Sequence, residues 1–265
     1  MRLFANSHWC SLRGGIDMRT NRPSGSYGQS GGYRDDFNNG YNPRSHNYGH
    51  NPYGRQSEVL SPSMYNGLIG IVLLYGFVLN YLMVKHCTEF FLTMNLWVLL
   101  IGYFVLCLIG IFMSKASDNP VVSFIGYNFV VVPIGAVLSV CLAGVAPDLV
   151  KNVVLVTAGV TTVMLVAGTL FPNVFKSIGG ALGIALLAVI IIELICGLLL
   201  KIIMPTFWDV IVALIFCGYI GFDWAVAQDE EPTADNAIDA CVGLYLDIVN
   251  LFLRLLSIMG DRDRD

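Results

Sequence analysis

Three acidic side chains lie well inside long apolar stretches in the last third of the chain, away from the stretches' first residues. They are Glu193 in AVIIIELICG, Asp223 in GFDWAVAQ and Asp247 in GLYLDIVN. A carboxylate in apolar surroundings loses its hydration, so such groups are retained where they handle protons or cations, or where they pair with another residue. These three residues are therefore the first candidates for a functional site.

The spacing of Asp223 and Asp247 allows them to meet across two consecutive antiparallel helices. Asp223 precedes the end of one apolar stretch by about five residues, and Asp247 follows the start of the next by about eleven, so their depths differ by roughly 9 Å. Two carboxylates in contact cannot both ionise cheaply, so they would share one proton and form a proton-sensitive latch. The alternative is two separate aspartates, each capped or facing water near a helix end.

The last apolar stretch carries a line of polar residues. Asp247, Asn250 and Arg254 stand at positions i, i+3 and i+7, so they share one helical face. Such a face must contact protein or water rather than lipid, which predicts a central helix on which Asp247 and Asn250 line a path. For Arg254 we favour a side chain that extends to the lipid headgroups. For Glu193 two interpretations stay open: it binds a cation or proton, or it pairs with a hydroxyl or amide of another span.

Apolar stretches of transmembrane length must position these side chains. Of all residues 55% are hydrophobic and only 13% are charged, against about 25% charged in an ordinary soluble domain. Backbone groups in lipid must be bonded within their own segment, so each stretch is predicted to be a helix, and the whole an all-α membrane protein of seven spans. The predicted spans are Gly67–Val84, Phe90–Ser114, Asn119–Pro147, Asn152–Phe175, Ser177–Leu200, Ile202–Gln228 and Asn236–Gly260. In the fifth span Gly179-x-x-x-Gly183 is a close-packing motif, which we expect to be structural rather than a dimer contact.

Residues 1–66 differ from the rest of the chain. They are rich in Gly, Tyr and Asn, carry seven Arg against four acidic residues and show no apolar periodicity, so we expect a disordered tail. The alternative is a Tyr/Arg-rich tail that associates with itself or with a protein partner. The arginines favour a cytoplasmic N-terminus. We expect the seven-helix domain to cover residues 67–260, followed by a charged tail over residues 261–265. The start of translation, at Met1 or Met18, stays open.

Charge and cysteine usage argue against several other classes of protein. Residues 67–265 carry eight basic and fifteen acidic side chains, whereas a nucleic-acid-binding protein would present a basic folded face. Six of the seven cysteines lie in or beside apolar runs at irregular spacings, which is typical of buried residues rather than of disulfides or a zinc site. We expect no cofactor.

The segment LYLDIVNLFL, residues 244–253, followed by Leu255 and Leu256, resembles the signature of the Bax-inhibitor-type family, also called the transmembrane Bax inhibitor motif family. Phe222, Asp223 and Gln228 are similar to the family's sixth helix, and the resemblance covers about residues 67–260, most closely in the last two helices. It implies seven helices with the last one central, and a pH-responsive calcium leak in which Asp223 and Asp247 are the proton-sensing pair. Some relatives carry an acidic residue and an arginine in the second helix, whereas residues 96–113 here have neither, and Lys115 is the nearest base.

Together these features predict a pH-sensitive calcium leak channel, in a bacterial plasma membrane, that contacts the lipid bilayer, Ca²⁺ and protons. In it Asp223 and Asp247 gate the path and make weak, transient contacts with the cation, while Asn250, Arg254 and Glu193 belong to its polar stripe. One alternative is a membrane adaptor that inhibits a protease or a death-pathway partner through its N-terminal tail. A second is a proton-coupled transporter with Glu193 and the aspartates as a relay. We do not expect an enzyme.

Overall fold

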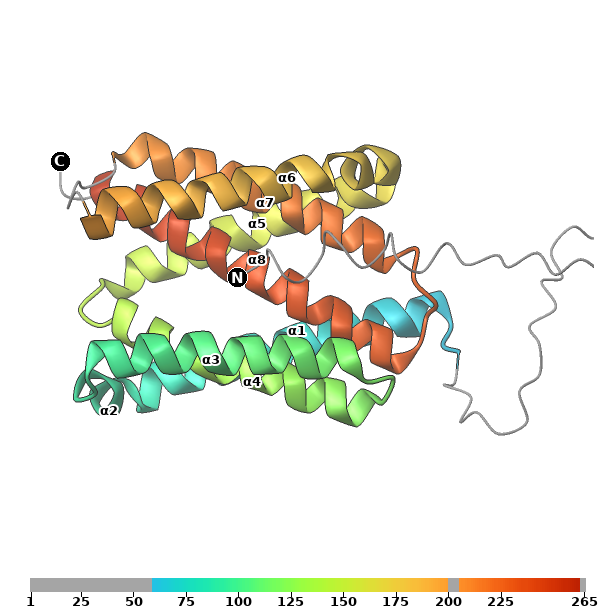
Figure 1. Ribbon diagram of the computed structural model, residues 1–265, viewed down its shortest axis with the longest axis horizontal. Helices are drawn as coiled ribbons and strands as arrows, with labels where there is room; N and C mark the ends of the chain where they lie inside the picture. The colour runs from blue at the N-terminus through green and yellow to red at the C-terminus, as the bar shows by residue number, and fades with distance from the viewer. Residues whose placement is uncertain (1–58, 200–204, 263–265) are drawn as a thin grey trace, which may run out of the picture.

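The computed structural model describes residues 59–199 and 205–262, and these residues form helices joined by short loops (Figure 1). Seven of the helices are long and apolar enough to cross a membrane, which confirms the predicted all-α membrane fold. The elements are α1 (Pro62–His86), α2 (Thr88–Leu92), α3 (Leu96–Ala116), α4 (Pro120–Cys141), α5 (Pro147–Leu170), α6 (Pro172–Glu193), the π-helix η2 (Leu194–Leu199), α7 (Thr206–Ala227) and α8 (Ala234–Arg262). Of the predicted tail at residues 1–66, residues 1–58 lie outside the described residues, and so do residues 200–204 and 263–265.

Local sequence signals set the helix starts. α1 begins at Pro62, earlier than the predicted Gly67, because Ser61 Oγ accepts a hydrogen bond from the Met64 amide at 3.3 Å and Pro62 occupies the first turn. Asn95 caps α3 and Asn119 caps α4 in a similar way: the side-chain oxygen of each accepts a hydrogen bond from the backbone amide two residues later in the chain. Each of these helices therefore starts where a side chain satisfies an amide that has no partner inside the helix.

Three further predicted span boundaries are wrong, because they were set by the positions of charges rather than by breaks in the backbone. The span predicted to continue to Phe175 ends at Leu170, since Pro172 has no amide to continue α5 and instead occupies the first turn of α6. The third span ends at Cys141, before a turn that contains Gly144 with a φ of 80°. The second divides into the short α2 and the membrane-spanning α3.

Helix α8 lies between two groups of helices, as the resemblance implied. In Figure 1 the red α8 crosses obliquely from one group to the other; it packs against α1, α3 and α4 on one side and against α5 and α7 on the other. Helix α6 packs on α7. Tyr245 and Asp247 on α8 have no exposed surface. The seventh span is thus the central helix, and a polar residue on it is enclosed by protein rather than by lipid.

Small residues allow the closest helix contacts. A Cβ atom at Gly126 on α4 would lie 2.7 Å from the carbonyl oxygen of Gly110 on α3, so these two backbones touch. A Cβ atom at Gly179 on α6 would collide with the ring of Phe222 on α7, and one at Gly183 would lie 3.7 Å from the Tyr219 hydroxyl. The Gly179-x-x-x-Gly183 motif therefore packs α6 on α7, as expected for a structural motif.

Candidate functional site

Asp223 and Asp247 lie at the same interface, between α7 and α8. Asp223 is 6% exposed and Asp247 is 0% exposed. The Asp223 carboxylate lies against Gly243 on α8, where an added Cβ atom would collide with Asp223 Oδ2. Asp247 follows Gly243 by one helical turn, and side chains on a helix lean toward its N-terminus, so Asp247 leans toward the space that the absent side chain of Gly243 leaves. Asp247 is also the middle residue of the span Ala234–Gly260.

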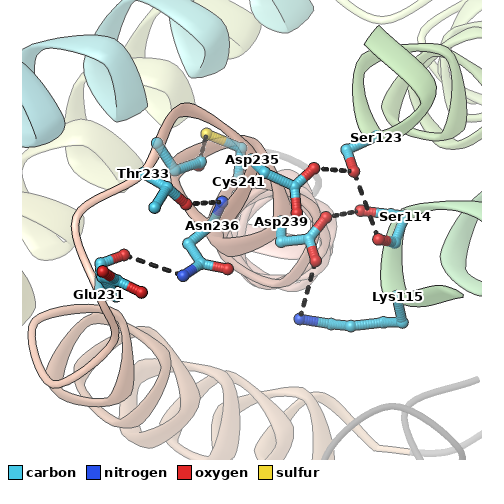
Figure 2. Close-up of polar contacts among 10 residues, drawn as sticks. Ser114, Lys115, Ser123, Glu231, Thr233, Asp235, Asn236, Asp239 and Cys241 are labelled. Atoms are coloured by element: carbon cyan, nitrogen blue, oxygen red, sulfur yellow. Dashed lines mark hydrogen bonds and ion pairs between the residues drawn. The ribbon is translucent and has the colours of Figure 1, made fainter. Parts of the chain in front are cut away.

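A polar network joins the start of α8 to α3 and α4, as Figure 2 shows. The Ser123 hydroxyl donates to Asp235 Oδ1 at 2.6 Å, and the Ser114 hydroxyl donates to Asp239. Lys115 Nζ lies 3.8 Å from Asp239 Oδ2. Sequence reasoning did not select Asp235 or Asp239 as site residues; carboxylates in the first turns of a helix are common, since they complement its dipole. Their serine partners could not be identified without the fold.

A cavity of about 50 Å³ lies between this network and the aspartates. Its lining includes Asp223, Glu230, Asp239 and Gly243, and among its lining residues Lys115 is the only base. Most of the wall is apolar, but the four charged side chains offer hydrogen-bond partners, and the volume is sufficient for water. The end of the bundle near the start of α8 therefore offers hydrated carboxylate oxygens that extend from the surface inward to Asp223. Among the described residues, no group of three or more His, Cys, Asp or Glu side chains could hold a metal ion together.

Glu230, in the loop after α7, should make stability depend on pH. Although Glu230 is exposed overall, partial desolvation at the cavity wall raises its pKa above the ordinary 4.5; the nearby Lys115 opposes this rise, and Asp223 adds to it. Ionisation of Glu230 is therefore less favourable in the folded than in the unfolded protein, and this lowers stability at neutral pH. Below about pH 4.5 Glu230 is protonated in both the folded and the unfolded protein, so the loss of stability vanishes. We expect Glu230→Gln to raise the thermal unfolding midpoint in detergent at about pH 7 and to leave it unchanged at about pH 4. A lower midpoint at neutral pH would mean that attraction to Lys115 outweighs desolvation.

Asn250 lines a second cavity on the other side of Asp247. This cavity, of about 30 Å³, is also lined by Tyr103 of α3 and by Val249 and Leu253 of α8. Asn250 Nδ2 donates to the carbonyl of Leu246 in its own helix at 2.6 Å. Along α8, Leu246 lines the first cavity and Val249 lines the second. Asp247 therefore lies between the two sets of lining residues.

Arg254 and Glu193 form a separate cluster at the opposite end of α8. The expected extension of Arg254 to lipid headgroups is wrong, because its guanidinium forms ion pairs with Glu193 Oε1 at 2.7 Å and with Asp209 Oδ1 at 2.8 Å. Glu193 also accepts a hydrogen bond from Trp208 Nε1 at 3.1 Å. Its partners are thus an arginine and an indole, not a hydroxyl or an amide. Glu193 and Arg254, which the sequence analysis assigned with Asn250 to the polar stripe, thus form a cluster with Asp209.

Comparison with known proteins gives a family and several relatives. Residues 57–264 match the family described as "Inhibitor of apoptosis-promoting Bax1". The chain is 28% identical over 179 residues to "Bax inhibitor 1" of Schizosaccharomyces pombe, an alignment that covers 65% of each chain. It is 49% identical over 49 residues to "Protein LIFEGUARD 3" of Arabidopsis thaliana, which covers 18% of this chain and 19% of the relative. It is 30% identical over 113 residues to an uncharacterized protein of Helicobacter pylori, 40% of this chain and 48% of the relative.

Each of these alignments spans less than two thirds of the relative's own length. The family match is broader: it includes all seven spans and both Asp223 and Asp247. Because it covers most of the chain, and because the described residues contain seven helices of membrane-spanning length, this chain is an integral membrane protein that belongs to the Bax inhibitor family.

Proposed function

We propose that this protein is a calcium leak channel whose conductance responds to pH through Asp223 and Asp247. The observation that carries the proposal is the burial of both carboxylates at one interface, Asp223 against Gly243 and Asp247 one turn further along the central helix. If the two carboxylates meet at this interface, ionisation of one opposes ionisation of the other. Membership of the Bax inhibitor family is consistent with this function.

The proposed gate works through the charge of this pair. With one proton shared, the two side chains attract each other and hold α8 against α7; with both ionised, they repel and favour a second arrangement of the helices. Protonation therefore biases an equilibrium between two packings. The conducting arrangement could be favoured at low or at high pH, depending on the contacts made in each arrangement. The direction of the pH dependence is measured by the flux experiment.

The proposed path follows α8 past Asp247. The first cavity offers the oxygens of Asp239, Glu230 and Asp223, which are the ligands that hard cations such as Ca²⁺ prefer. The second cavity begins beyond Asp247 and offers the amide of Asn250. Both cavities are lined by α3 as well as α8, so a displacement of α3 from α8 would join them. Lys115, at the first cavity, would supply the positive charge that relatives place in the same helix.

In this proposal the end of the bundle that holds Lys115 and the Glu230 loop faces the cytoplasm, together with the N-terminus, in the plasma membrane of a bacterium. The arginines of residues 1–66 support this orientation. A cation would then enter or leave the cytoplasm through the acidic cavity.

The experiment is calcium flux into dye-loaded liposomes that carry the purified full-length protein, from about pH 5.5 to about pH 8.5. We expect flux above that of empty liposomes, with a clear dependence on pH. Flux that persists when a protonophore abolishes any proton gradient supports a channel, and flux that stops indicates a proton-coupled transporter. No flux at any pH would contradict both and favour an adaptor that acts through a protein partner.

A further inference from the structure

A second charged cluster lies at the end of α8 far from Lys115, and neither the aspartate pair nor the cavities involve it. Arg254 of α8 contacts two other helices: its Nη1 lies 2.8 Å from Asp209 Oδ1 on α7, and its Nη2 lies 2.7 and 3.0 Å from the two carboxylate oxygens of Glu193 on α6. The three side chains are 26%, 16% and 31% exposed for Arg254, Asp209 and Glu193. Partly desolvated arginine pairs of this kind are the strong ones, and they fix orientation.

All four carboxylate oxygens of the cluster have a partner. Glu193 Oε1 also accepts from Trp208 Nε1 at 3.1 Å, and Asp209 Oδ2 accepts from the Ser257 hydroxyl at 2.7 Å. A fully satisfied polar network is more rigid than a single surface ion pair. Glu193 is moreover the last residue of α6 before the π-helix Leu194–Leu199, a helix type that occurs often where function requires irregular geometry.

The two ends of α8 are therefore attached to different groups of helices. At its start, Asp235 and Asp239 accept hydrogen bonds from Ser123 of α4 and Ser114 of α3. Near its end, Arg254 is held by α6 and α7. Asp247 lies between these two anchors, so the axial position of Asp247 relative to Asp223 depends on both of them.

We infer that Arg254 is a positioning residue: its ion pairs with Glu193 and Asp209 tie the C-terminal half of α8 to the α6–α7 pair and hold the leak in its closed arrangement from the end opposite the acidic cavity. The inference rests on the proposed function for its effect on flux, and on the geometry alone for its effect on the motion of α8. Loss of the anchor frees α8 to shift against α7, which populates the open arrangement without any change in the aspartates.

The test is the flux of Arg254→Gln in liposomes at the pH where wild-type flux is lowest. We expect an increase of about tenfold, the change in population that the loss of one strong, partly buried ion-pair site produces. Asp209→Asn removes one ion pair and should raise flux less, by about threefold. It keeps the test informative even if Arg254→Gln does not purify as folded protein. The conservative variant Arg254→Lys keeps a positive charge between Glu193 and Asp209 and should keep flux closer to the wild-type value than Arg254→Gln does.

The matched control is Lys176→Gln. It removes the ion pair of Lys176 with Asp229, 2.5 Å long, which joins α6 to the loop after α7 and does not involve α8. We expect its flux to equal that of the wild type. An increase as large as that of Arg254→Gln would overturn the inference, because the effect would then be a general loss of stability.

Amide hydrogen exchange in detergent separates this inference from the proposed function. Arg254→Gln should speed exchange in residues 248–260, and Lys176→Gln should not. A wild type without flux would refute the proposed function, while faster exchange in Arg254→Gln would still support the anchor. Unchanged exchange in Arg254→Gln would overturn the anchor itself. Faster exchange with unchanged flux in an active channel would overturn its role in closing the leak.

Discussion

The double variant Asp223→Asn with Asp247→Asn is expected to conduct calcium at a rate that no longer depends on pH. Asparagine has the shape of aspartate but binds no proton in this range, so the interface keeps its packing and loses its titration. In the liposome assay the ratio of the highest to the lowest flux between about pH 5.5 and about pH 8.5 should fall to about one. This is the largest functional effect expected of any substitution, because it removes the whole proposed sensor.

The control for this variant changes the same charge at two exposed positions. Asp118 and Asp148 both lie outside the cavity and are exposed to solvent. The variant Asp118→Asn with Asp148→Asn should retain the wild-type pH profile. Each single variant, Asp223→Asn or Asp247→Asn, keeps one titrating carboxylate without its acidic neighbour, so its profile should keep a pH response with a displaced midpoint. A double variant with the wild-type profile would show that the sensor lies elsewhere, and the carboxylates at the start of α8 would be examined next.

The variant Gly126→Leu is expected to destabilise the fold strongly. Its Cβ atom would lie 2.7 Å from the Gly110 carbonyl oxygen and 2.9 Å from the Ser114 amide nitrogen, both backbone atoms of α3. Backbone atoms of a helix cannot move aside one at a time, so α3 and α4 must separate, at a cost of about 3 kcal/mol or more. The separation would also displace Ser114 from Asp239. The measurement is the thermal unfolding midpoint and the monodisperse yield in detergent.

Gly180→Leu provides the comparison. An added Cβ atom at Gly180 on α6 meets no atom within 4 Å, so the substitution introduces no clash. Because leucine favours a helix by roughly 0.5 to 1 kcal/mol over glycine, the midpoint should stay the same or rise slightly. Equal unfolding midpoints for the two variants would show that the close contact of α3 with α4 is not needed for stability.

The sequence alone predicted the features that depend on local physics, namely the need of backbone groups in lipid for hydrogen bonds and the transfer of apolar side chains out of water. Seven apolar stretches of transmembrane length became seven helices, because an unpaired backbone group in lipid is too costly to leave open. Asp223 and Asp247 stood out for the same reason, since few charges interrupt those stretches. The sequence also contains the signals for two helix breaks, Pro172 after Phe171 and the glycine at position 144. The predicted spans missed both breaks because they were bounded by charged residues.

The partners of the charges were decided only by the tertiary structure. Arg254 was expected to reach lipid headgroups, yet Glu193 and Asp209 lie 61 and 45 residues before it and contact it directly. Asp239 was not selected from the sequence, yet Ser114 of α3 and Lys115 approach it. The sequence determines that an intramembrane charge needs a partner; which partner it finds depends on the rotation and depth of each helix around α8, and these follow from packing between residues distant in the chain.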